Sequence, residues 1–65
     1  MKDFVVRLLD ERSELYAKMA KLHYFIESDE AESIDKAMLG LMRVQHQVMK
    51  TYHTVLSERI DLLLK

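Results

Sequence analysis

The second half of the 65-residue chain carries three polar residues at intervals of seven, Gln45, Tyr52 and Arg59. These residue types suit a nucleotide: arginine binds phosphates, tyrosine stacks on a base, and glutamine bonds with a base edge. In the first half, Arg12, Tyr16 and His23 lie within or at the edge of an apolar pattern. Arginine is rarely buried without a partner, so such groups have a partner or face a wet cavity.

Two other interpretations of Gln45, Tyr52 and Arg59 stay open beside the ligand pocket. The three side chains could form a hydrogen-bond network that fixes register at an oligomer interface, as polar seam residues do in coiled coils. Arg59 would then lie level with Asp3 and could pair with it. Surface exposure near a frayed helix end is the third interpretation, and it fits Arg59 better than Tyr52.

A row of charged residues follows one side of the first half: Arg7, Glu11, Glu14, Lys18 and Lys21. A solvated face with ion pairs is the simpler interpretation, because Glu14 and Lys18 have the favourable i,i+4 orientation. Alternatively, Arg7, Lys18 and Lys21 form the rim of an anion site and close over phosphates held by a neighbouring copy.

The histidines do not indicate a metal site. His46 and His53 are seven residues apart, about 10 Å along a helix, which is too far to share one ion. They are expected on the polar, exposed side of the second helix. HExxH is absent, no His has a Glu three residues before it, and the acidic segment lacks the calcium-loop pattern. We expect no metal and no cofactor.

Catalysis and nucleic-acid binding are also disfavoured. The chain has no cysteine, no serine lies in a nucleophile-elbow context, and a Glu11–Glu14 carboxylate pair on one helix is more simply a solvated face. The net charge is −1 and the basic residues alternate with acids, so no one-signed stripe would bind DNA or RNA. We therefore expect a binding protein and not an enzyme.

The composition fits one small α-helical domain, residues 1–65. Apolar residues make up 49% of the chain, and a single glycine and no proline leave few tight turns for a β fold. The longest apolar runs are three residues, far short of the about 20 that span a bilayer or the apolar run of a signal peptide. These features predict a cytoplasmic protein that does not enter a membrane.

Two helices must position the polar residues. Apolar residues recur at steps of three and four on both sides of the polar, acidic segment 27–33. The pattern predicts helices over residues 3–27 and 34–63 joined by a turn at 28–33, hence an antiparallel αα-hairpin. Ser33 is the expected N-cap of the second helix with Asp35 just inside it, and Asp29 with Glu32 is a rival capping box.

Both predicted helices have apolar arcs that are wider than a hairpin needs. On a helical wheel each arc spans about 160°, against about 100° for a helix that faces one core. Val44, Val48, Val55 and Leu62 belong to the second arc, and Tyr52 lies near its centre. The surplus apolar surface of each helix needs another partner to cover it. We therefore expect the hairpins to assemble into a homo-oligomeric helical bundle.

The chain resembles a family of small phage and prophage hairpin proteins. The resemblance covers nearly the whole chain, and its most specific parts are Phe25-Ile26-Glu27-Ser28 and a Q-x3-M-x2-Y-x3-L-x2-R run from Gln45 to Arg59. Proteins of this build are similar to phage anti-defence sponges, notably the sequestin type. Such sponges oligomerise and sequester nucleotide immune signals, either cyclic dinucleotides or cyclic ADP-ribose variants.

The resemblance implies a function and a site. Gln45, Tyr52 and Arg59 match the pattern in the second helix, and Arg7, Lys18 and Lys21 match it in the first; Arg12 and Tyr16 rest on the wheel alone. The implied function is sequestration of a nucleotide signal by a phage-encoded oligomer. The competing hypothesis is a helical protein-interaction module, an adaptor or inhibitor of a host protein, with no small-molecule ligand.

Overall fold

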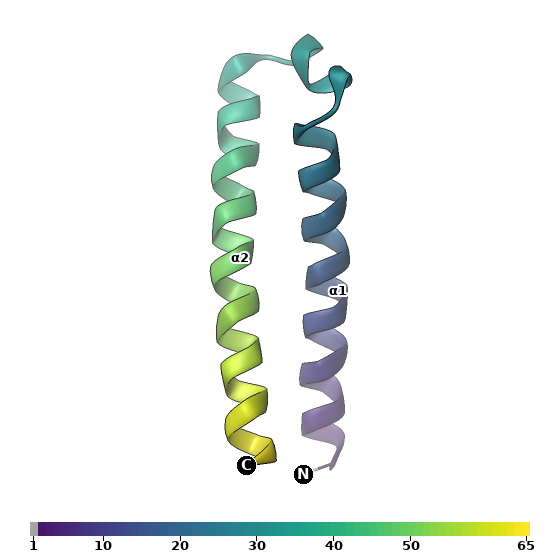
Figure 1. Cartoon of the computed structure of the whole chain (residues 1–65), viewed down its shortest axis with the longest axis vertical. Helices are drawn as coiled ribbons and strands as arrows, with labels where there is room; N and C mark the ends of the chain where they lie inside the picture. The colour runs from purple at the N-terminus through teal and green to yellow at the C-terminus, as the bar shows by residue number, and fades with distance from the viewer. Residues whose placement is uncertain (1) are drawn as a thin grey trace.

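A computed structural model describes residues 2–65 as two long antiparallel helices. Helix α1 covers Lys2–Ile26 and helix α2 covers Lys36–Leu64, with a short 3-10 helix, η1, at Asp29–Ser33 between them. Figure 1 shows both chain ends at one end of the rod and η1 at the other, above the end of α1. The predicted all-α hairpin is confirmed, and the rod measures 46 × 14 × 13 Å between Cα atoms.

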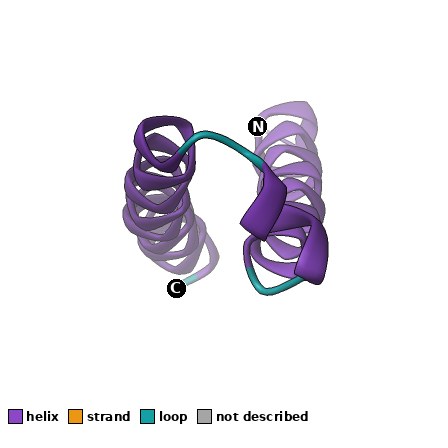
Figure 2. Cartoon of the chain, turned by 90° about the horizontal axis from the view of Figure 1, so that it is seen from above, coloured by secondary structure: helices purple, strands orange, loops and turns teal. Residues whose placement is uncertain are grey.

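The connection contains structure that the sequence pattern did not indicate. Residues predicted as a plain turn form η1, and Figure 2 shows this short helix lying over the end of α1, with a loop that crosses to α2. Ala31, within this short helix, is buried, with 3% of its surface exposed. Ser28 closes the end of α1 by donating its hydroxyl to the Phe25 carbonyl at 2.6 Å.

The predicted N-cap of the second helix is wrong. Asp35, not Ser33, occupies the cap position, and the Asp35 carbonyl accepts the Leu39 N–H at 2.9 Å. Ser33 instead donates its hydroxyl to the Glu30 carbonyl at 2.7 Å, inside η1. The 3-10 helix thus uses the serine that the pattern assigned to α2, because a short polar side chain can bond to nearby backbone on either side.

The core lies in the half of the hairpin that is remote from the turn. Leu8 and Leu15 from α1 pack with Leu56 and Ile60 from α2, and Leu9, Met19 and Met49 pack against this cluster. Leu56 has none of its surface exposed. Near the turn, only Ile26 and Ala31 are buried among the described residues. One end of the seam is therefore well packed, while its middle holds half-buried polar side chains.

Much apolar surface stays uncovered in the single hairpin. Most of it lies on α2, where Leu41, Val44, Val48 and Leu62 are each at least 60% exposed. This agrees with the surplus width of the apolar arcs. Neither helix in the described part of the chain combines the length and apolarity of a bilayer span.

Gly40 offers a direct test of the helical assignment of α2. It lies inside the helix without a positive φ, and a Cβ added there would meet no atom within 4 Å. Gly40→Ala should therefore stabilise the protein by about 0.5–1 kcal/mol, which raises the Tm by about 2–8 °C. Thermal unfolding followed by circular dichroism measures this shift.

The matched control reverses the change at an exposed position of α1. Ala17→Gly should lower the Tm by a similar amount, because it adds the same backbone freedom to a helix interior. A Gly40→Ala protein with an unchanged or lower Tm would contradict a regular, open helix at residue 40.

Candidate ligand-binding groove

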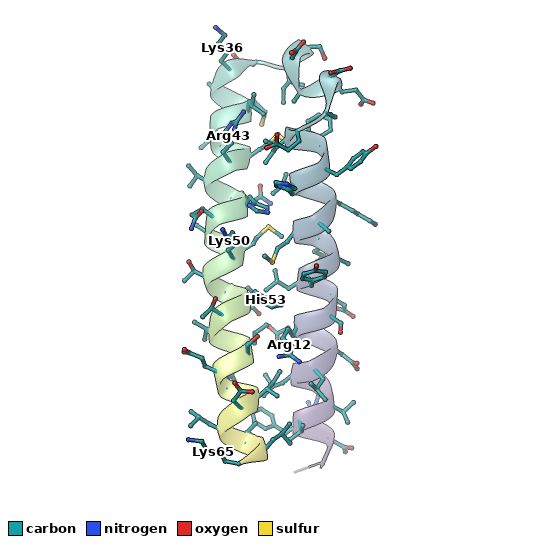
Figure 3. All side chains as sticks on the ribbon, in the orientation of Figure 1. Arg12, Lys36, Arg43, Lys50, His53 and Lys65 are labelled. Atoms are coloured by element: carbon teal, nitrogen blue, oxygen red, sulfur yellow. The ribbon has the colours of Figure 1, made fainter. Side chains whose placement is uncertain are left out.

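Three polar pairs join the helices along one edge of the seam. The Arg12 guanidinium donates to the Ser57 hydroxyl at 3.3 Å. The Tyr16 ring lies 5.8 Å from the His53 ring, and the His23 ring lies 5.3 Å from the His46 ring, measured between centroids. We call this edge the polar groove; it consists of Arg12, Tyr16 and His23 from α1 and His46, His53 and Ser57 from α2. Figure 3 shows Arg12 and His53 pointing into the space between the helices.

The antiparallel arrangement explains why these residues meet. In each pair the two residue numbers add to 69, so the partners lie at equal heights on helices that run in opposite directions. Arg12, Tyr16 and His23 are separated by four and seven residues, which keeps them on one side of α1. The groove runs about 16 Å along the helix axis from His23 to Arg12.

The position of the histidines corrects a prediction. His46 and His53 are half-buried against α1 and not on the exposed polar side of α2. The wheel centred the apolar arc near Tyr52, whereas α1 packs about 60° away, against Met49, Leu56 and Ile60. The histidines lie on the flank of that buried seam.

A cavity of about 330 Å³ opens at the turn-side half of the groove. Tyr16, His23, Tyr24 and His46 line it with Met19 and Ala20. Its walls are aromatic and apolar, with a small number of polar atoms, as in many small-molecule sites. The volume is at the lower end of the usual range for drug-sized ligands, so it has room for a group about as large as one nucleobase.

A second cavity, of about 460 Å³, lies at the end of α1 and does not suit a phosphate. Tyr24 and Ser28 line it together with the carboxylates of Glu27, Asp29 and Glu30. Those three acids would repel an anion. Nor do the described residues contain a group of three or more His, Asp or Glu side chains placed to hold a metal ion.

Basic side chains border the polar groove, and no residue that lines the groove or its cavity is a carboxylate, although Glu27 lies one helical turn beyond His23. Lys36, Arg43 and Lys50 follow one another every seven residues on α2 (Figure 3), and the same interval leads on to Ser57. Between residues 36 and 57 the chain has no acid at all. The α1 carboxylates Asp10, Glu11 and Glu14 lie about 100° or more around the helix from the groove residues. The groove is thus a positive, aromatic surface.

The structure brings only two of the eight predicted site residues into this groove, Arg12 and Tyr16. Gln45, Tyr52 and Arg59 are exposed on a different side of α2. The Arg59 guanidinium lies over the Phe4 ring, 6.0 Å from its centroid, in place of the pairing considered with Asp3. Arg7, Lys18 and Lys21 are exposed on a side of α1 that faces away from the groove, and Arg7 Nε donates to the Asp3 carbonyl at 3.4 Å.

The comparison with known families identifies the chain. The family model described as Sequestin matches residues 2–62. The protein belongs to the Sequestin family. This confirms the resemblance to the sequestin type noted from the sequence, and the match includes α1, all but the last two residues of α2, and every residue of the polar groove. No match was found among the curated proteins or among the solved structures.

Proposed function

We propose that this Sequestin-family protein is a phage-encoded, non-catalytic binding protein that sequesters a nucleotide immune signal in the bacterial cytoplasm. The ligand class is a cyclic dinucleotide or an ADP-ribose derivative. The observation that carries the proposal is the polar groove, where a guanidinium, four aromatic rings and a 330 Å³ cavity lie together without a carboxylate. Family membership supports it, because the family name denotes sequestration and not catalysis.

Each part of the groove has a role in this proposal. Arg12 holds a phosphate: guanidinium has five N–H donors, and the bond to Ser57 takes up one of them. Tyr16 stacks on a base in the cavity beside His23 and His46. Arg43 and Lys50 add long-range attraction for an anion. Because both helices hold the groove before the ligand arrives, little conformational entropy is lost on binding.

Self-association belongs to the same proposal. The apolar stretch of α2 that α1 leaves uncovered fits a homo-oligomer. Several hairpins in one particle would present several copies of the groove, so that a small protein could remove a signal from solution in quantity.

A spectrum of the purified protein is the first test. The chain has three tyrosines and no tryptophan, so its own absorbance is weak, and a co-purified nucleotide should give a maximum near 260 nm. A thermal-shift screen against cyclic di- and trinucleotides and cyclic ADP-ribose isomers follows. A ligand present at 100 times its Kd should stabilise the protein by about 2.7 kcal/mol, a rise in Tm of about 10–20 °C.

The exposed apolar surface of α2 that α1 leaves uncovered also favours the second candidate, a protein-interaction module that binds a host protein. The two candidates give opposite results. A module would capture one host partner in stoichiometric amount, and the purified protein would show no 260 nm maximum. If no nucleotide in the screen raises the Tm at concentrations well above micromolar, the sequestering proposal is rejected.

A further inference from the structure

Helix α2 carries two apolar stripes, each with the spacing of a coiled-coil seam. The first stripe faces α1 and consists of Leu39, Met42, His46, Met49, His53, Leu56, Ile60 and Leu63. The second stripe consists of Met38, Leu41, Gln45, Val48, Tyr52, Val55, Arg59 and Leu62. Both follow the three-four alternation through four heptads without a break, a pattern typical of helix-to-helix packing.

The two stripes differ in burial. Residues of the first stripe are buried or half-buried, with only Leu63 at the chain end reaching 37% exposure. All eight residues of the second stripe are exposed, including Leu41 at 67% and Val48 at 62%. In coiled coils a polar residue at such a core position fixes the register and the orientation of the partner helix. Gln45, Tyr52 and Arg59 hold those positions here.

We infer that the second stripe binds the second stripe of another copy, with the two α2 helices antiparallel and centred near residue 50. This inference rests on the self-association proposed above and specifies its surface. Full overlap of two helices that span residues 36–64 places Gln45 opposite Val55 of the second copy, and Val48 opposite Tyr52. Every apolar residue of the stripe then meets another stripe residue.

Charge selects the antiparallel orientation. Residues 27–35 hold five carboxylates, Glu27, Asp29, Glu30, Glu32 and Asp35, and no basic side chain. A parallel pair would put two such acidic segments side by side. It would also place Arg59 of one copy opposite Arg59 of the other, so that two positive charges would meet in the interface. The antiparallel pair places the acidic segments at opposite ends of a rod about 46 Å long, beyond the about 8 Å screening length at physiological salt.

The available area matches a stable dimer. A long face of the hairpin measures 46 × 14 Å between Cα atoms, and side chains extend it further. Specific interfaces bury about 800 Å² per partner, which a face of this size supplies only when its side chains are counted and nearly all of it is used. Phe4 of α1, 42% exposed and in contact with Arg59, borders the second stripe and extends the apolar area. A second copy laid along the face uses its full length.

Disulfide trapping tests the arrangement cleanly, because the chain has no cysteine of its own. In a mixture of Gln45→Cys and Val55→Cys proteins, oxidation should give the mixed disulfide as the main product. Each variant alone should stay largely reduced, since in this register equal positions lie about 15 Å apart and a disulfide needs Cα atoms within about 7 Å. Gln47→Cys with Thr54→Cys, both exposed and at least 120° around α2 from the centre of the stripe, is the matched control pair and should not cross-link.

Sedimentation provides the second measurement. Val48→Glu should weaken self-association at least 100-fold, while Gln47→Glu, one residue away on the exposed surface, should leave it unchanged. Val48 is exposed in the hairpin, so the helical content should survive the change. Any one of three results would overturn the inference: homodisulfides of each single variant, no disulfide in the mixture, or a wild-type protein that is monomeric at 100 µM. A monomer that still binds a nucleotide would leave the sequestering proposal standing, whereas a dimer without any nucleotide ligand would remove the sequestering proposal alone.

Discussion

Replacing Arg12 with alanine is expected to weaken binding of the nucleotide signal about 10- to 100-fold. A hydrogen bond to a charged group contributes about 1.5–3 kcal/mol, and every 1.4 kcal/mol changes a dissociation constant tenfold. The Arg12 guanidinium lies at the core-side end of the polar groove, where it already contacts Ser57 at 3.3 Å. Isothermal calorimetry with the nucleotide that gives the largest thermal shift measures the loss.

Ser57→Ala separates ligand binding from structural support. This variant removes the same interhelix hydrogen bond as Arg12→Ala but leaves the guanidinium in place. It should therefore share any small loss of stability while keeping most of the affinity. Arg12→Lys should fall between the wild type and Arg12→Ala, because an ammonium keeps the charge but not the planar set of donors.

The same experiment distinguishes the groove from the site predicted by sequence resemblance. Arg7 and Arg59 match the family pattern, yet both are exposed away from the groove. Arg7→Ala should leave affinity unchanged. If Arg7→Ala and Arg59→Ala abolish binding while Arg12→Ala does not, the ligand lies on the other face and the polar groove is a structural seam.

The sequence predicted the hairpin well because helix periodicity and the polar break between residues 27 and 33 are local signals. The helices begin and end within two residues of the predicted positions. The cap was less predictable. Ser33 is chemically suited to several backbone partners, and only the 3-10 turn decides that its hydroxyl bonds to Glu30.

The groove was only partly predictable. Arg12 and Tyr16 stood out as polar interruptions of the apolar arc, whereas His46 and His53 were assigned to the exposed side. The error comes from treating the apolar arc of α2 as one surface when it consists of two stripes. Aligning the two helices in antiparallel register would have matched His46 to His23 and His53 to Tyr16, but that register depends on the turn.

Leu56→Ala is expected to lower stability more than any other leucine-to-alanine change in this chain. Leu56 is completely buried between Leu8, Leu15 and Ile60, which form most of the core. Deleting a buried leucine side chain costs about 2.7–5 kcal/mol, because the transfer energy is lost and a cavity remains. In a domain of this size that equals a fall in Tm of roughly 11–40 °C, so a marginally stable protein would unfold near room temperature. Circular dichroism against temperature measures it.

Leu64→Ala is the control for this prediction, since it makes the same chemical change at a position that is 64% exposed. It should alter stability by less than about 0.5 kcal/mol. Both variants must be compared with the wild type at one protein concentration, because self-association would make the Tm depend on concentration. A Leu56→Ala protein as stable as Leu64→Ala would mean that the interhelix core of the single hairpin contributes little. The contacts between copies would then hold the fold together, and the second stripe of α2 would be its main source of stability.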